Sequence, residues 1–209
     1  MKKIVMSLFL ALADVGATNA ATEKAIVAGG CFWCVESDFE SVPGVTSVVS
    51  GYSGGTIENP SYSQVGNGGS GHYEAVEITF DNSKVTYEQI LHMFFRSIDP
   101  LDSGGQFCDR GDSYRTAIFV TNSAQKVVAA AARLEATSAL GQEVATSILQ
   151  AKRFWPAEDY HQDYYKGQNL VITRAGPKKQ SNAYKFYRNA CGRDQRVKEL
   201  WGGQAAFTH

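Results

Sequence analysis

One short segment, GCFWCVE at residues 30–36, constrains the fold of this chain more than any other. It follows the apolar run AIVAG at residues 25–29, which predicts a strand, and the two adjoining glycines predict a tight turn. From Val35 onward the pattern is that of an amphipathic helix, which places Cys31 at the helix N-terminus. The unpaired backbone N–H groups and the positive end of the helix dipole favour a thiolate there. Two aromatic residues follow, so we expect a reactive sulfur beside an apolar wall, suited to sulfur or acyl chemistry on a small, partly apolar group.

Strand and helix patterns alternate along the rest of the chain. We expect strands at residues 25–29, 45–52, 73–80, 114–121 and 144–149. We expect helices at residues 32–41, 86–98 and 123–140, with a last helix opening at residues 157–161. The first six elements have the order β-α-β-β-α-β, which matches the ferredoxin-like pattern. The predicted fold class is therefore α+β: a two-layer α/β sandwich with a mixed sheet, helices on one face, and an extra helix and strand.

The remaining segments are polar. A long loop at residues 53–71 is rich in Gly, Ser and Asn, and loops of this length are often functional. A second polar loop spans residues 101–113. Residues 178–209 predict a long irregular C-terminal tail, which carries Cys191.

The composition is that of a soluble globular protein. Hydrophobic residues make up 44% of the 209 residues, and 20 basic side chains face 21 acidic ones. Because there is no basic stripe, the sequence argues against a nucleic-acid partner.

The first twenty residues have the three parts of a secretory signal. Lys2 and Lys3 precede an apolar stretch at residues 4–13, and Thr18-Asn19-Ala20 resembles a cleavage site. We expect residues 1–20 to be a signal peptide, residues 21–209 to form a single catalytic domain, and the mature protein to be periplasmic. Ten apolar residues are too few to span a bilayer, so we expect no membrane anchor. The alternative is an apolar N-terminal tail on a cytosolic protein.

The four cysteines leave several interpretations open. Cys31 and Cys34 have the spacing of a thioredoxin-like disulfide-exchange site. A zinc site would need two further ligands, and Cys108 and Cys191 are solitary in the sequence, so we expect no metal. A non-catalytic secreted binding domain with two structural disulfides is a third possibility.

An acidic residue stands at the start of a predicted strand. In GHYEAV, residues 71–76, Glu74 begins a strand that is apolar on one face. A carboxyl group half-buried at such a boundary has a raised pKa and donates a proton near neutral pH. The alternative is an ordinary solvent-facing glutamate.

Five motifs occur in order between Ile26 and Tyr165: GCFWCVE, GYSGG, GHYEAVEI, DRGDSYRTAIF and FWPAEDYHQDYY. Together they closely resemble the class A peptide methionine sulfoxide reductases. The resemblance implies a two-layer α/β fold, Cys31 as nucleophile, and Glu74 as the acid that protonates the sulfoxide oxygen. It also implies that Phe32 and Trp33 form an aromatic wall for the substrate methyl group. Tyr52 and Tyr114 are implied as the phenols that bind the oxygen, and Asp109 as a further polar site residue.

The resemblance also implies a reaction. A sulfoxide sulfur is a poor electrophile until its oxygen is protonated or strongly hydrogen-bonded. Thiolate attack then leaves methionine and a sulfenic acid on Cys31, which a second thiol converts to a disulfide. A thioredoxin-like dithiol reduces that disulfide. The expected substrates are the S epimer of methionine sulfoxide, free and in oxidised proteins, and we expect a monomer without cofactors.

The chain departs from the commonest family pattern at Cys34, where glycine often follows the tryptophan. This raises the question of which thiol resolves the sulfenic acid. Cys191 is our first candidate, because family members often keep a resolving cysteine in this region. Cys34 is second: it is close to Cys31, but the two share one rigid helical turn, which would have to unwind locally for the sulfurs to face each other. Cys108, in the loop before Asp109, is third.

Overall fold

The computed structural model describes residues 21–208. The signal peptide expected at residues 1–20 lies outside this range. The elements of the main body are β1 Thr22–Gly29, α1 Phe32–Glu40, β2 Val45–Ser53, α2 Tyr62–Gly66, β3 Tyr73–Asp81, α3 Tyr87–Phe95, β4 Gly105–Gln106, β5 Asp109–Arg110, β6 Thr116–Val120, α4 Ser123–Leu140, β7 Ser147–Gln150 and β8 Trp155–Pro156. They are followed by β9 Leu170–Thr173, β10 Gly176–Lys179, α5 Gln180–Ala190 and α6 Arg193–Trp201.

The main sheet has the strand order β7-β6-β1-β3-β2-β8. Its four central strands pair antiparallel, and β7 adds parallel to β6. The order β6-β1-β3-β2 is that of a ferredoxin-like core, so the predicted α+β class and mixed sheet are confirmed. Short 3₁₀ turns and two small hairpins, β4–β5 and β9–β10, complete the architecture.

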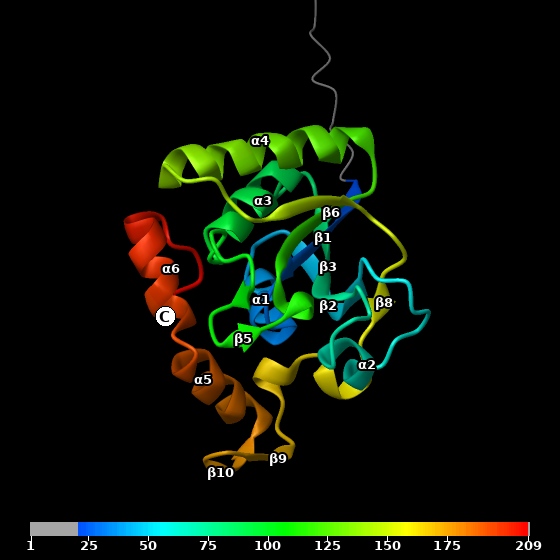
Figure 1. The fold of residues 1–209 in the computed structure, drawn as a ribbon, viewed down its shortest axis with the longest axis vertical. Helices are drawn as coiled ribbons and strands as arrows, with labels where there is room; N and C mark the ends of the chain where they lie inside the picture. The colour runs from blue at the N-terminus through cyan, green and yellow to red at the C-terminus, as the bar shows by residue number, and fades with distance from the viewer. Residues whose placement is uncertain (1–20, 209) are drawn as a thin grey trace, which may run out of the picture.

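Alternation along the strands gives the sheet two apolar faces. The larger face, which includes Val76, Ile78 and Phe80 of β3, packs against α1, α3 and α4. The smaller face, which includes Ala75 and Phe119, is covered by the chain around residues 149–154. In Figure 1, α4 lies at one end of the molecule and the β9–β10 hairpin at the other, with α5 and α6 along one flank.

The turn between β1 and α1 requires glycine. Gly30 has φ +81°, and a Cβ at this position would lie 2.5 Å from the Cβ of Gln106. A Cβ on Gly29 would press at 3.1 Å on both Ile98 and Val35. The two glycines therefore let the chain turn sharply into α1 and bring Cys31 to the end of the sheet.

Two sequence expectations are corrected here. The helix expected to open at residues 157–161 is instead a pair of 3₁₀ turns, Asp159–His161 and Tyr164–Lys166, separated where Asp163 takes a left-handed φ of 55°. The C-terminal tail is not irregular, since it forms a hairpin and two helices. Helix α6 buries Arg193, Val197 and Trp201 at helical spacing. Because arginine counts as a polar residue in a hydrophobicity pattern, the sequence shows no amphipathic periodicity there.

Within residues 21–208, no helix combines the length and apolar character needed to cross a bilayer.

Candidate active site

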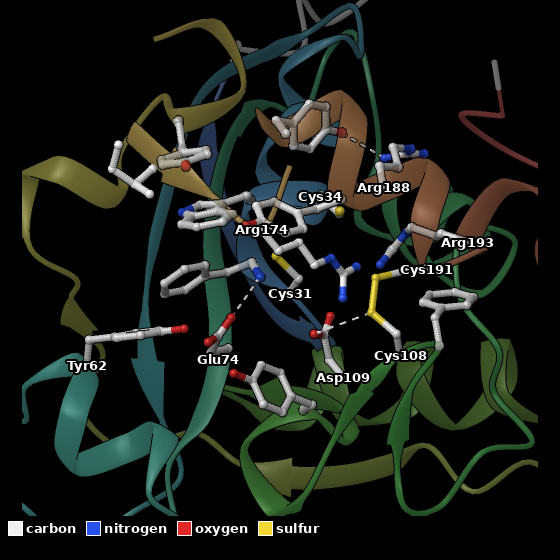
Figure 2. Close-up of a pocket in the computed structure, with 18 residues that line it drawn as sticks. Cys31, Cys34, Tyr62, Glu74, Cys108, Asp109, Arg174, Arg188, Cys191 and Arg193 are labelled. Carbon is white, nitrogen blue, oxygen red and sulfur yellow. Dashed lines mark hydrogen bonds between the residues drawn. A yellow bond between two sulfur atoms is a disulfide. The ribbon is translucent and has the colours of Figure 1, made fainter. Parts of the chain in front are cut away.

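Cys31 is the N-cap residue of α1 and opens into a pocket of about 570 Å³. The pocket is lined by side chains from α1, α2, β3, the loop at residues 101–113 and the C-terminal helices (Figure 2). Its lining includes Cys31, Phe32, Trp33, Cys34, Tyr62, Glu74, Phe107, Cys108, Asp109, Tyr114, Tyr164, Tyr184, Arg188, Cys191 and Arg193. The structure therefore brings together seven of the eight predicted site residues, all but Tyr52, and adds others.

Glu74 lies at the base of this pocket and is 2% exposed. Its Oε2 accepts a hydrogen bond of 3.1 Å from the backbone N–H of Phe32. Burial, followed by the nearby charge of Asp109, raises the pKa of Glu74 from 4.5 to about 8. The carboxyl group is therefore largely protonated at neutral pH, which equips it as a proton donor.

Two phenols lie beside this acid. Tyr114, at the end of a 3₁₀ turn, is hydrogen-bonded to Glu74 and to Tyr62. Burial raises the pKa of Tyr62 to about 12, so its hydroxyl remains a neutral donor. Both phenols face the pocket, where they supply hydrogen bonds to an oxygen atom.

The structure does not place Tyr52 in the pocket. Tyr52 is fully buried on β2, packs against Phe32, and donates its hydroxyl to Glu158 at 2.9 Å. Tyr62, on the short helix α2, lines the pocket instead. The capping box formed by Ser61 and Gln64 was the sequence signal that marks this helix and its tyrosine.

Phe32 and Trp33 form the apolar wall. Trp33 stacks on Tyr164 with ring centroids 3.7 Å apart and an angle of 4°. Its Nε1–H donates to Nδ1 of His161 at 3.2 Å. Burial lowers the pKa of His161 to about 4, so the imidazole stays neutral and accepts this hydrogen bond. The wall is thus fixed in orientation before any ligand arrives.

Cys31 and Cys34 are free thiols joined by a hydrogen bond. That hydrogen bond, together with the positive charges of Arg193 and Arg188, lowers the pKa of Cys34 against the opposing effect of its burial. The same bond, burial, and the acidic neighbours Glu74 and Asp109 raise the pKa of Cys31 well above its usual value. Of the two thiols, Cys34 is therefore the one whose pKa is lowered.

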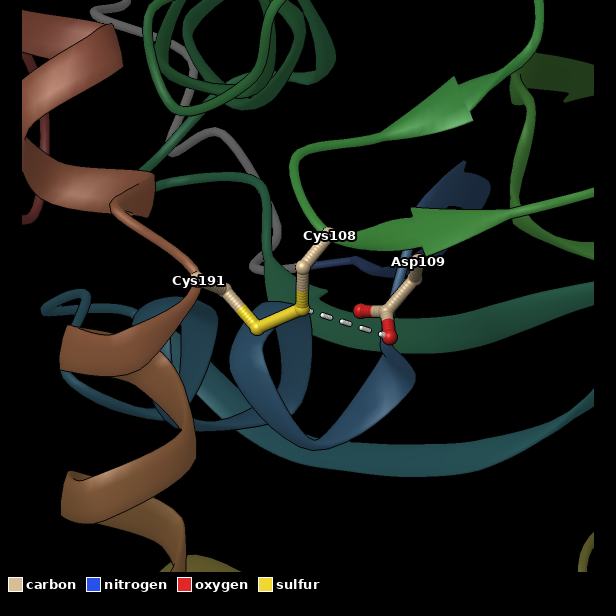
Figure 3. Close-up of side chains that lie close together, drawn as sticks. All are labelled: Cys108, Asp109 and Cys191. Carbon is tan, nitrogen blue, oxygen red and sulfur yellow. Dashed lines mark hydrogen bonds between the residues drawn. A yellow bond between two sulfur atoms is a disulfide. The ribbon is translucent and has the colours of Figure 1, made fainter.

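The other two cysteines form a disulfide. Cys108 and Cys191, 83 residues apart in the chain, have Cα atoms 4.9 Å apart (Figure 3). Asp109 lies beside them, with Oδ1 3.8 Å from the Cys108 sulfur, and burial raises the pKa of Asp109. Cys191 caps the C-terminus of α5, which brings the tail against the loop at residues 101–113. The two cysteines that appear solitary in the sequence are therefore partners in the fold.

Two arginines of the C-terminal helices were not predicted from the sequence. Arg193 is 2% exposed and donates to the carbonyl oxygens of Gly29 and Ser97 at 3.2 and 3.1 Å, while its Nε has no partner. Arg188 pairs with Asp38 of α1 at 2.7 Å. Both place positive charge near Cys34.

Two clusters in residues 21–208 have the ligand types of a metal site. In the first, Cys108 and Cys191 are bonded to each other beside Asp109. In the second, Glu40 and Asp163 both pair with Nζ of Lys166 at 2.8 Å, and Glu36 completes the group. The lysine places one positive charge against two carboxylates of that second cluster.

One pocket contains a thiol, a protonated acid, two phenols and three further cysteines. This combination is typical of a thiol-dependent oxidoreductase. Comparison with known proteins identifies the family. The model of the peptide methionine sulfoxide reductase family matches residues 23–201. The chain therefore belongs to the peptide methionine sulfoxide reductase family, whose members reduce methionine sulfoxide with thiols.

Individual relatives agree with this assignment. Peptide methionine sulfoxide reductase MsrA 2 of Caulobacter vibrioides is 46% identical, over 97% of this chain and 100% of the relative. Peptide methionine sulfoxide reductase MsrA/MsrB of Vibrio cholerae is 48% identical over 90% of this chain, which spans only 47% of that protein. The crystal structure of reduced Mxr1 from Saccharomyces cerevisiae is similar with a TM-score of 0.67 and 27% identity, over 69% of this chain and 84% of that one.

Proposed function

We propose that this protein reduces the S epimer of methionine sulfoxide, both as the free amino acid and within oxidised proteins, through a sulfenic acid on Cys31 and an intramolecular disulfide. The observation that carries the proposal is the placement of Cys31 in one pocket with a protonated Glu74, two phenols and an aromatic wall. This arrangement addresses separately the sulfur, the oxygen and the methyl group of a sulfoxide.

The residues act on three parts of the substrate. Phe32 and Trp33 contact the methyl group, and Tyr62, Tyr114 and Glu74 bind the oxygen. Cys31, which packs against Cys34, attacks the sulfur as its thiolate. Glu74 protonates the oxygen as it leaves the substrate. In net terms the oxygen moves from the substrate sulfur to the Cys31 sulfur, so methionine leaves and Cys31 becomes a sulfenic acid.

A second thiol of the pocket and an external dithiol complete the cycle. A thiol condenses with the sulfenic acid, releases water and forms a disulfide. A thioredoxin-like protein then reduces the enzyme by disulfide exchange. Two observations support this partner: the exposed position of Cys108 at the pocket, and a solved complex of the yeast relative Mxr1 with Trx2.

A single-turnover experiment tests the proposal. The fully reduced protein is mixed with diastereomerically pure methionine S-sulfoxide, without reductant, and methionine and remaining thiols are counted. We expect methionine from the S epimer, none from the R epimer, and none from Cys31→Ser. Equal reaction of both epimers, or an undiminished rate in Cys31→Ser, would contradict the proposed function.

We also propose that the protein is exported to the periplasm after cleavage near Ala20, and that the mature enzyme is a monomer without a membrane anchor. The basic start, short apolar stretch and small-residue end of residues 1–20 support export. N-terminal sequencing of protein from the periplasmic fraction is expected to begin near Ala21. Sedimentation of that protein is expected to give one chain per particle, and a full-length chain in the cytosol would refute export.

A further inference from the structure

The β9–β10 hairpin contributes two side chains to the pocket that the reaction itself does not use. Ile172 of β9 and Arg174 of the turn that follows it both line the pocket. Both are exposed, Ile172 to 83%. Figure 2 shows the guanidinium group of Arg174 directed into the pocket. Because Glu74 at the base is only 2% exposed, Ile172 and Arg174 lie at the mouth of the pocket.

The segment that carries this part of the mouth is strongly basic. Residues 164–191 include no acidic side chain. Their basic side chains are Lys166, Arg174, Lys178, Lys179, Lys185 and Arg188. The whole chain has 20 basic and 21 acidic side chains, so this positive charge is a local feature of the hairpin and α5. A patch of one sign beside a cleft raises the local concentration of ligands of the opposite sign.

Two of these cations contact aromatic rings. The guanidinium carbon of Arg174 lies 5.7 Å from the ring centroid of Phe186 and 5.6 Å from that of Tyr187. Nζ of Lys178 lies 5.5 Å from the Phe186 centroid. Within residues 21–208, neither Arg174 nor Lys178 pairs with a carboxylate. Contact with a ring face orients a guanidinium group and leaves its N–H groups available for an anion.

We propose that Arg174 is a specificity-determining residue, which binds the carboxylate of an acidic side chain next to the oxidised methionine. The preferred protein substrates are then acidic segments. This inference rests on the proposed function and deepens it, because it names the substrate class. Ile172 adds an apolar contact for the same segment, and Lys178 extends the positive surface along the hairpin.

The position of Arg174 at the mouth favours a residue that flanks the oxidised methionine over the methionine itself. The sulfoxide is bound deep in the pocket, between the aromatic wall, the phenols and Glu74, so the flanking residues of a peptide pass the mouth. A guanidinium group offers two parallel N–H donors to a carboxylate. Because the group is exposed, we expect the pair to change the rate by only about 2- to 5-fold and to weaken with added salt.

Three blocked peptides test the inference. Each contains one methionine S-sulfoxide, flanked on both sides by glutamate, by glutamine or by lysine. Fully reduced protein is mixed with each peptide below saturation, without reductant, and the rate at which the first methionine forms is measured at low and at high ionic strength. We expect the glutamate peptide to react fastest and the lysine peptide slowest, with a smaller difference at high ionic strength. Equal rates for the three peptides would overturn the inference.

Arg174→Glu is the decisive variant. Reversal of this charge is expected to invert the order, so that the lysine peptide becomes the fastest. Arg174→Lys keeps the positive charge and is expected to keep the order of the unmodified chain. An unchanged order in Arg174→Glu would refute the role of this residue.

Lys126→Glu is the matched control. It makes the same change in net charge at an exposed position of α4, at the opposite end of the molecule from the hairpin (Figure 1). We expect it to keep the order of the unmodified chain. An inverted order in Lys126→Glu as well would show that net charge decides the preference, against a specific role of Arg174.

Two further results would assign Arg174 to a different ligand and so overturn the inference. In Arg174→Glu, a loss of rate on free methionine S-sulfoxide as large as that on the glutamate peptide would assign the residue to the α-carboxylate of the substrate. An unchanged order of the peptides, with slower turnover by a thioredoxin, would make the hairpin a surface for the reductant. No methionine from any peptide with the unmodified chain would refute the reductase function itself, which separates the two failures.

Discussion

The backbone N–H of Phe32 donates a hydrogen bond of 3.1 Å to Oε2 of Glu74. The bond ties the first residue of α1 to the second residue of β3. Because Cys31 directly precedes Phe32, this single contact fixes the position of the acid relative to the nucleophile. It leaves the other carboxyl oxygen of Glu74 available for a proton.

Replacing Glu74 by glutamine keeps this acceptor but removes the proton donor. We expect Glu74→Gln to slow the sulfoxide reduction step by about 10²- to 10⁴-fold, the usual contribution of general acid catalysis. Because the pKa of Glu74 is about 8, the rate for the unmodified enzyme is expected to fall as pH rises through that value. Rapid-quench measurement of methionine formation between pH 6 and 10 checks both effects. An unchanged falling limb in Glu74→Gln would assign that limb to another group.

The same pKa predicts a pH dependence of stability. Glu74 binds its proton more tightly in the folded state than in the unfolded one, where the pKa is near 4.5. Its contribution to folding is fully present below that unfolded value and is lost as pH rises through about 8. We therefore expect Glu74→Gln to gain stability relative to the unmodified protein between pH 5 and pH 8. Urea denaturation at the two pH values measures this difference, and a constant difference would contradict it.

Tyr62 and Tyr114, and not Tyr52, are expected to bind the sulfoxide oxygen. Removing either hydroxyl, by Tyr62→Phe or Tyr114→Phe, is expected to lower kcat/KM on the order of 10²-fold, as for the loss of one oxyanion donor. Tyr52→Phe is the control, because its hydroxyl bonds Glu158 outside the pocket. We expect it to cost about 1 kcal/mol of stability and to change kcat/KM little. A large rate loss in Tyr52→Phe alone would restore the original assignment.

The difference between Tyr52 and Tyr62 shows which parts of the fold can be predicted from the sequence. Strand β3 and helices α1, α3 and α4 each span nine or more residues, long enough for a periodic or continuous apolar pattern. The sequence therefore predicts these elements nearly to their ends. Helix α2 has five residues, too few to produce a periodic pattern, so the sequence predicts a loop there.

The disulfide between Cys108 and Cys191 could not be predicted from the sequence, for a different reason. Four cysteines allow three pairings, and nothing local to Cys108 or Cys191 indicates that 83 residues of chain bring them together. The buried guanidinium groups of α5 and α6 are a second example. Arg188 lies inside because the carboxylates of Asp38 and Asp194 compensate its charge, and a pattern of apolar positions does not reveal such partners.

Trp33 is expected to act on binding more than on chemistry. Its ring stacks on Tyr164 and is held by the hydrogen bond to His161. We expect Trp33→Ala to raise KM about 10-fold or more, with a smaller effect on the single-turnover rate at saturation, because the wall contacts the methyl group in both ground and transition states. Trp33→Phe keeps an aromatic face and is expected to recover most of the lost affinity. Equal KM values for the two variants would argue against an aromatic wall.

The buried pair of Arg188 and Asp38 joins the C-terminal helices to the catalytic helix. Their side chains are 5% and 1% exposed, and the two atoms lie 2.7 Å apart. Removing Arg188 leaves the buried carboxylate of Asp38 with the more distant guanidinium of Arg193, 3.9 Å away. We therefore expect Arg188→Met to cost about 3–5 kcal/mol of unfolding free energy, measured by urea denaturation. The control is Lys166→Met, since Lys166 is 52% exposed in its pair with Glu40 and is expected to contribute at most about 1 kcal/mol. Asp38→Asn/Arg188→Met is expected to cost less than the sum of the single changes, because neither charge is then left alone. Additive costs would show that the two helices are held to α1 by packing and not by this pair.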